Sequence, residues 1–300
     1  MSNKVENTNE EWKSDIISAF IEGYISEDKQ SAYAKIGYNY LCYAPKYLYK
    51  YIGDNTKSFE SIFEGKIWFS APCSFNDVFD CDLSIDEKSI FENALMLFPD
   101  KRGLRQGSPI WHDIKNRTFK AISVLRKEFE ELKTTIGIAC FSEVFDSLLM
   151  WSHYANNHSG ICVEYDLLKM NKQLSYSPVP IIYSSERVFI DKISVDTIDY
   201  ESVKSLINCT TTKSPEWAYE KEWRIIRDNA ACGEQWDSIN KGALLEMITP
   251  NSIIMGCMIQ PVIEDRIKEF CSNNKINLYK MDKSLTSYGL IKKEIMLFDE

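Results

Sequence analysis

The sequence lacks an excess of positive charge, and this absence limits its partners. Its 35 lysines and arginines are outnumbered by 44 aspartates and glutamates, which gives a formal net charge of −9 over 300 residues. A chain this acidic has no global basic field to hold a nucleic-acid backbone or an anionic membrane surface. Any contact with nucleic acid would have to be local.

Long apolar runs are also missing. No segment approaches the roughly 20 apolar residues that a membrane-spanning helix needs, and the polar start MSNKVENTNEEWKSD lacks the apolar core of a signal peptide. The nine cysteines include no CxxC pair, and several stand in apolar stretches such as GIACFS. This usage is typical of reduced, buried thiols. The sequence therefore predicts a cytoplasmic protein with no membrane partner and no metal site.

Several enzyme motifs are absent too. The sequence has no P-loop, no GxGxxG, no GxSxG and no HExxH. The classes of enzyme that depend on these motifs are therefore disfavoured.

What is present is an irregular mixture of helical and strand patterns. Two helical patterns fill 12–42 and end before Pro45, with Ser26 as the candidate cap between them, and further helical patterns run over 115–133 and about 194–208. The segments YLYKYI (47–52), KIWFS (66–70), TIGIACFS and GICVEYD are typical of short buried strands. Because no regular βαβ period appears, we expect an α+β fold with a mixed, largely antiparallel central sheet and flanking helices. Residues 1–45 are predicted to be an N-terminal helical extension, and 46–300 a single α+β domain.

The first candidate constellation lies between two predicted strands. Trp151, His153 and Tyr154 stand in a short helical segment, and Ser142 ends the strand before it. Imidazole can donate or accept a hydrogen bond and a phenol can stack, so these residues suit a planar or phosphorylated ligand. The alternative is that Trp151 and Tyr154 are core residues and His153 is structural.

The second constellation is FNDVFD at 75–80. Asn76 and Asp77 favour a turn because their side chains bond nearby backbone groups. A structural turn and a ligand-binding loop fit this segment equally well. Asp77, Asp80 and Asp82 could crowd a divalent cation, although their spacing does not match an EF-hand.

The third constellation is WAYEKEWRII at 217–226. On a strand, Glu220 and Glu222 would share one face, and their repulsion would raise one pKa and prepare that carboxyl for acid or base work. The alternative is a structural strand in which Glu222 pairs with Arg224.

Together these motifs resemble a large bacterial family catalogued as a domain of unknown function, often found beside mobile elements and phage-defence genes. The matching segments occur in one order: Tyr49–Tyr51 (YKY), Ile67–Asp77 (IWFS to FND), Cys140–Ser142 (CFS), Met150–Ala155 (MWSHYA), Gly160–Asp166 (GICVEYD), and Tyr219 with Glu222–Arg224 (YxxEWR). One departure is Val78, where the family usually has proline.

The order of residues is also similar to that in ADP-ribosyltransferase-like folds, which use a basic residue on one strand, Ser or Tyr on a second and an E-x-E pair. Here Lys50, Ser142 and Glu220-Lys221-Glu222 take these places. The likeness implies that Glu222 binds a ribose hydroxyl of NAD and stabilises an oxocarbenium-like transition state, while Tyr154 stacks on nicotinamide.

These observations favour an intracellular bacterial effector, acting in phage defence on NAD or a nucleotide by ADP-ribosyltransferase-like or glycohydrolase-like chemistry. NAD is the candidate substrate, and the sequence establishes no cofactor. The predicted catalytic residues are Glu222, Glu220 and His153, and the predicted ligand-binding residues are Lys50, Asn76, Asp77, Ser142, Trp151, Tyr154 and Arg224.

Two alternatives remain. The same residues could form a non-catalytic module that binds and regulates through a small nucleotide-like ligand or a partner protein. A metal-dependent nuclease using Asp77, Asp80 and Glu222 is disfavoured, because the acidic chain lacks a basic stripe.

Overall fold

One large sheet organises the fold. The computed structural model describes residues 11–26, 28–54, 56–98, 104–173, 177–190, 200–228 and 232–296. In these residues the sheet has 11 strands, and its main path runs β11-β12-β2-β4-β1-β5-β13-β14-β15, with β10 attached to β4 and β6 to β10. The pairing of β13 with β14 is parallel and the other pairings in this sheet are antiparallel.

The strands of the large sheet are β1 (Tyr47–Ile52), β2 (Lys66–Ser70), β4 (Ile136–Ser142), β5 (Ile161–Asp166), β6 (Val179–Pro180), β10 (Glu222–Asp228), β11 (Trp236–Asp237), β12 (Gly242–Glu246), β13 (Ser252–Met255), β14 (Asn277–Lys283) and β15 (Leu290–Ile295). Two small parallel pairs join β3 (Ser84–Ile85) to β8 (Phe189–Ile190) and β7 (Ile182–Tyr183) to β9 (Thr212–Lys213).

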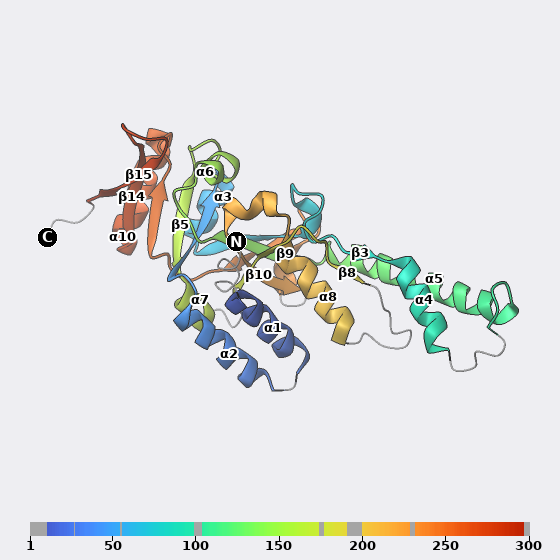
Figure 1. The fold of residues 1–300 in the computed structure, drawn as a ribbon. Coiled ribbons are helices and arrows are strands. Elements are labelled where there is room, and N and C mark those ends of the chain that lie inside the picture. Colours follow the sequence, from blue (N-terminus) through green and yellow to red (C-terminus); the bar gives the residue numbers. More distant parts are fainter. Residues whose placement is uncertain are drawn as a thin grey trace, which may run out of the picture.

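The helices are α1 (Glu11–Ile25), α2 (Lys29–Cys42), α3 (Thr56–Phe63), α4 (Glu87–Leu97), α5 (Pro109–Leu132), α6 (Leu148–Tyr154), α7 (Leu167–Gln173), α8 (Tyr200–Thr211) and α10 (Pro261–Asn274). Short 3-10 turns lie at η1 (Pro72–Ser74), η3 (Pro215–Glu220) and η4 (Gly233–Gln235). In Figure 1 α1, α2, α7 and α8 gather on one side of the molecule and α6 on the other, while α4 and α5 extend away from the sheet. The predicted α+β class, with a mixed and largely antiparallel sheet, is confirmed.

Both faces of the central strands are buried. In β1, Leu48 and Ile52 belong to the main hydrophobic core, whereas Tyr49 and Tyr51 belong to a second cluster that also contains Trp151 of α6. Alternate residues of a strand point to opposite faces, so one strand serves both clusters. The expected β1 and β2 coincide with the observed strands.

The N-terminal helices pack onto the domain. Ile16 and Ile36 lie in the main core, and the ring of Trp12 lies 6.0 Å from that of Trp223 in β10. The side chain of Asp28 caps α2 by accepting from the Ser31 amide, although Ser26 was the expected cap. The boundary at residue 45 stays a prediction.

Two other helices begin at different residues from those expected. A helix was expected over 115–133, but α5 begins at Pro109, because Ser108 caps its first turn and proline fits the first helical position. A helix was expected over about 194–208; residues 191–199 lie outside the described residues, and α8 covers 200–211. No helix in the described ranges is long and apolar enough to cross a membrane.

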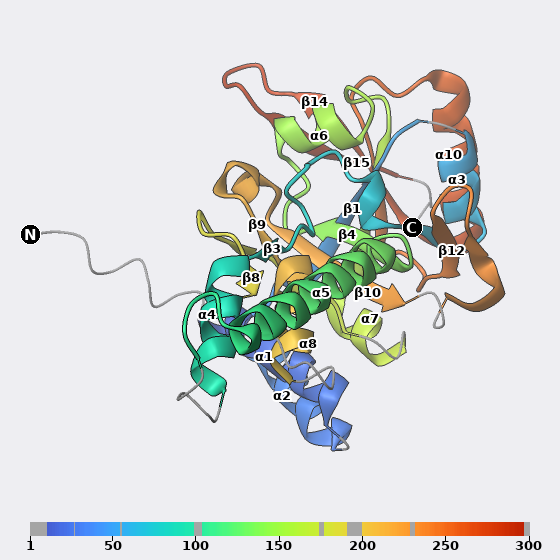
Figure 2. The same cartoon turned by 90° about the vertical axis from the view of Figure 1, so that its right-hand side faces the viewer.

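The sheet forks at β4. Strand β10 pairs with β4 along its whole length, from Ser142 to Ile136. Since β10 occupies that edge, β1 and β2 must share the other one: Tyr49 pairs with Ser142 at one end and Ser70 with Ile138 at the other. Within the described structure, neither strand pairs with residues 139–141 on this edge. Figure 2 shows the sheet and its helices from a second direction.

Candidate functional site

A pocket of about 520 Å³ opens at the fork of the sheet. Its wall combines β1, β2 and β4 with the loop after β2, helix α6 and the segment from η3 into β10. This volume lies in the range of small-molecule sites. The polar side chains that line it include Lys50, Asn76, Asp80, His153, Tyr154, Lys213, Glu220 and Glu222.

The fork leaves a backbone acceptor for Lys50. The Lys50 ammonium, on β1, donates to the carbonyl of Cys140 on the unpaired stretch of β4, at 3.1 Å. A buried carbonyl without a strand partner needs another donor, and the lysine supplies it. Burial lowers the pKa of Lys50, since it disfavours the charged form.

Arg224 anchors the back of the site. It is 0% exposed, and its two terminal nitrogens bind the two oxygens of Asp80 at 2.8 and 2.6 Å. Its Nε donates to Glu222 at 2.7 Å, and the carbonyl of Thr210 accepts a further bond at 2.9 Å. The structural alternative predicted the pairing of Arg224 with Glu222. The structure shows this pair and adds Asp80 as a second partner of Arg224. A two-pronged arginine–carboxylate pair fixes the orientation of both groups.

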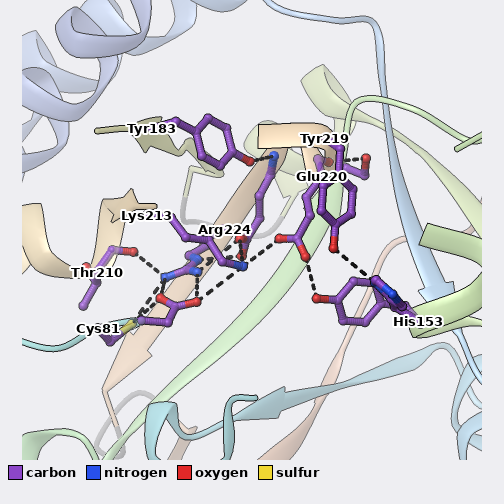
Figure 3. Close-up of polar contacts among 12 residues, drawn as sticks. Cys81, His153, Tyr183, Thr210, Lys213, Tyr219, Glu220 and Arg224 are labelled. Carbon is purple, nitrogen blue, oxygen red and sulfur yellow. Dashed lines mark hydrogen bonds and ion pairs between the residues drawn. The ribbon is translucent and has the colours of Figure 1, made fainter. Parts of the chain in front are cut away.

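Lys213 joins three carboxylates. Its ammonium, at the end of β9, lies 2.6 Å from Glu220, 3.0 Å from Glu222 and 3.5 Å from Asp80. Burial alone would lower the pKa of Lys213, but the charges of Glu222 and Glu220 outweigh it and raise that pKa. Figure 3 shows Lys213 between Arg224 and Glu220.

The environment of Glu222 keeps it ionised. Burial raises the pKa of this carboxyl, but the charges of Arg224 and Lys213 outweigh burial and bring the pKa to about 2. The amide of Glu222 also donates to the hydroxyl of Tyr183 at 2.9 Å. Glu222 is therefore a fixed negative charge in the pocket wall.

The pKa of Glu220 is displaced in the opposite direction, upward. Burial raises its pKa and the charge of Glu222 raises it further, against the opposing effect of Lys213. One Glu220 oxygen accepts from the Tyr154 hydroxyl at 2.5 Å and the other from Lys213. Two neighbouring carboxyls with pKa values displaced in opposite directions suit different roles in proton transfer.

The two glutamates do not share a strand face as expected. Glu220 ends η3, Lys221 adopts a left-handed conformation with φ of 44°, and only then does β10 begin at Glu222. This sharp turn brings both carboxylates to Lys213. The buried hydroxyl of Ser142 donates to the Glu220 carbonyl at 2.6 Å and holds the turn against β4.

Helix α6 brings His153 and Tyr154 to the pocket. His153 is exposed, and its Nδ1 lies 3.1 Å from the Tyr219 hydroxyl; Figure 3 shows this pair at one end of the polar cluster. After α6, Asn156, Asn157 and His158 all have positive φ, at 44°, 53° and 70°. A run of non-glycine residues in this region costs energy and persists only where surrounding packing requires it.

The remaining predicted residues lie around the pocket in different ways. Asn76 lines it, whereas Asp77 accepts from the Phe79 amide at 2.9 Å and so stabilises the turn. Trp151 is buried behind the pocket and donates to the Phe145 carbonyl at 2.7 Å. Ser142, Trp151, Asp77 and Arg224 support the site without lining it.

The cation cluster leaves little room for the nuclease alternative. Both oxygens of Asp80 contact Arg224, and both oxygens of Glu222 contact Arg224 or Lys213. Positive side chains thus occupy the positions that a metal would take beside these carboxylates. Among the described residues no group of three His, Cys, Asp or Glu is placed to hold a metal ion.

Sequence reasoning missed Lys213 and considered Asp80 only as a metal ligand. Lys213 stands in TTTKSP, a polar stretch that looks like an ordinary turn. Nothing local reveals its role, because its three partners come from the loop after β2 and from the η3–β10 segment.

A family model described as "Protein of unknown function (DUF2971)" matches residues 150–225. The matched segment runs from α6 to β10 and contains His153, Tyr154, Lys213, Glu220 and Glu222. The chain thus carries a segment of an uncharacterised domain family, as the motifs suggested. No curated protein and no solved structure matches the chain.

Proposed function

We propose that the protein is an enzyme that cleaves the N-glycosidic bond of NAD or a related nucleotide. The observation that supports this proposal best is the pair Glu220 and Glu222, joined by Lys213 in the wall of one pocket. Their pKa values are displaced in opposite directions. Enzymes that cleave glycosidic bonds commonly use two carboxyls with separate roles.

Glu222 is the fixed anion of this mechanism. As the bond between C1′ and the nicotinamide nitrogen breaks, its electron pair leaves with the nitrogen, and nicotinamide departs as a neutral molecule. Positive charge then develops on the ribose ring. A carboxylate that is already ionised and held in place stabilises this charge without reorganising.

Glu220 is the proton acceptor. Water adds to C1′ and transfers a proton to the Glu220 carboxylate, which completes the hydrolysis of NAD to nicotinamide and ADP-ribose. The Tyr154 hydroxyl and Lys213 orient this carboxyl. A raised pKa brings a carboxyl closer to the strength that proton transfer near neutral pH requires.

The pocket also offers surfaces for a planar base. Tyr51, Trp68 and Phe75 line it together with Tyr154, and aromatic rings stack on heterocycles. Stacking of Tyr154 on nicotinamide therefore remains part of the proposal. Transfer of ADP-ribose to another acceptor and action in phage defence are proposed from the motif resemblance alone, and cytoplasmic location is proposed from the cysteine usage of the sequence.

A second candidate function is a binding module without chemistry. The observation in its favour is that Arg224, Lys213 and the carboxylates satisfy one another completely, as a structural ion cluster would. In this case the pocket would hold a nucleotide without breaking it.

The test is to incubate the purified chain with NAD and to quantify nicotinamide by chromatography. The wild type is expected to release nicotinamide, and Glu220→Gln to lose about 100-fold or more of the rate, the usual contribution of a general base. Glu164→Gln is the matched control. Glu164 is also buried, but it lies outside the pocket lining and bonds to Tyr49 and Asn251.

If NAD binds to the protein and stays intact, the result favours the binding module. Equal losses in Glu220→Gln and Glu164→Gln would mean that general destabilisation, and not the pocket carboxyl, controls the rate. Either result would overturn the proposed chemistry.

A further inference from the structure

Lys50 has unused hydrogen-bonding capacity inside the pocket. An ammonium carries three N–H donors, and the one hydrogen bond found for Lys50 among the described residues goes to the Cys140 carbonyl. The same ammonium lies 5.4 Å from the centre of the Phe141 ring, a weaker attraction. Because Lys50 lines the pocket, a ligand can reach the remaining donors.

Lys50 also differs from the other pocket cations in its charge partners. Asp80, Glu220 and Glu222 are shared between Lys213 and Arg224 through direct ion pairs. Among the residues that the structure describes, no carboxylate forms an ion pair with Lys50. Lysines withdrawn from water are usually paired, because an unpaired charge there is costly. Lys50 is half-buried, and the charge of Glu222 acts on it without an ion pair.

We infer that Lys50 receives an anionic group of the substrate, the phosphate of a nicotinamide nucleotide. The inference rests on the proposed function and names the substrate class: nucleotides rather than nucleosides. A nicotinamide nucleotide carries charges of both signs, so its pyridinium ring suits the carboxylate side of the pocket and its phosphate suits Lys50.

Burial lowers the pKa of free Lys50, and a bound phosphate would raise it again. Binding at a pH near or above this lowered pKa is therefore accompanied by proton uptake. Affinity for the nucleotide should fall as pH rises through the lowered pKa of the free lysine.

The experiment compares nicotinamide mononucleotide with nicotinamide riboside by titration calorimetry. Both carry the pyridinium ring and differ in the phosphate. Full-length protein with Glu220→Gln prevents turnover during the titration. The mononucleotide should bind about 10- to 100-fold more tightly, as expected for hydrogen bonds to a charged group.

Three variants locate the effect. Lys50→Met should bring the affinity ratio close to one, and Lys50→Arg should retain a preference for the mononucleotide, since it keeps the charge. Lys292→Met is the matched control, because Lys292 lies over the rings of Phe145 and Tyr279 and outside the pocket lining. It should leave the ratio unchanged.

The inference is overturned if the affinity ratio of mononucleotide to riboside is the same with Lys50 and with Lys50→Met. It is also overturned if the mononucleotide does not bind. Its failure is separable from that of the proposed function. Equal nicotinamide release from riboside and mononucleotide would remove the role of Lys50 and keep the chemistry. If the preference for phosphate depends on Lys50 but no bond is cleaved, the role of Lys50 is kept and the proposed chemistry is lost.

Discussion

Arg224 and Asp80 stand 144 positions apart and form a two-pronged ion pair at the back of the pocket, with both side chains buried. This pair ties the loop after β2 to β10, and Glu222 and Lys213 complete the cluster. The geometry of the carboxylates therefore depends on a charge that does not line the pocket.

Replacing Arg224 should destabilise the fold strongly. Arg224→Ala leaves Asp80 and Glu222 buried without their main counter-ion, and breaking such a pair costs about 3–5 kcal/mol. Chemical denaturation measures the free energy of unfolding. Arg266→Ala, which removes an exposed pair with Glu60, should cost at most about 1 kcal/mol. A similar small loss for Arg224→Ala would show that the cluster contributes little to stability.

Glu222 should make stability depend on pH in acid. Its folded pKa, about 2, lies below the ordinary value of 4.5, so its contribution is fully present above about pH 4.5. The contribution is lost as pH falls from there toward 2. Unfolding curves at pH 5, 4 and 3 should show a steeper loss for the wild type than for Glu222→Gln. Parallel losses in both proteins would contradict the assignment.

Glu220 should set the acid limb of activity. In the proposed mechanism its carboxylate accepts a proton, so kcat/KM falls as pH drops through its raised pKa. Burial is the largest cause of that elevation, and the hydrogen bond from Tyr154 opposes it. Tyr154→Phe should therefore move the acid limb to higher pH. An unmoved limb would mean that Glu220 is not the titrating base.

The loop that follows α6 should tolerate no side chain at Gly160. A Cβ there would overlap the backbone carbonyl of Ile52, whereas a Cβ at Gly37, in α2, would meet no atom within 4 Å. Gly160→Ala should lower the melting temperature and displace α6 from the pocket. Gly37→Ala should stabilise by about 0.5–1 kcal/mol, because alanine is the better helix former. Equal effects of the two changes, measured by thermal unfolding, would contradict this description of the loop.

The sequence predicted what local patterns determine. YLYKYI and KIWFS carry β-branched and aromatic residues in short runs, and both form the expected strands. The cluster of FND, MWSHYA and YEKEWR residues around one pocket was also anticipated, since Asn76, His153, Tyr154, Glu220 and Glu222 all line it.

The parts that escaped prediction depend on contacts between distant segments. The fork exists because β10 fills one edge of β4 and leaves β1 and β2 to divide the other. Lys213 gains its importance only from carboxylates on other segments. The expected E-x-E strand was replaced by a turn at Lys221, where a left-handed lysine breaks the strand pattern. The hydrophobic periodicity of the sequence does not reveal such contacts between distant segments.

The most direct measurement is a crystal structure of Glu220→Gln with intact NAD. The proposal predicts the nicotinamide ribose in the pocket at the fork, with C1′ within about 3.5 Å of a Glu222 oxygen, the distance of a reactive arrangement. It also predicts a phosphate oxygen in hydrogen-bond contact with Lys50. NAD bound with its glycosidic bond away from Glu220 and Glu222, or bound outside this pocket, would contradict the assignment of these carboxylates to bond cleavage.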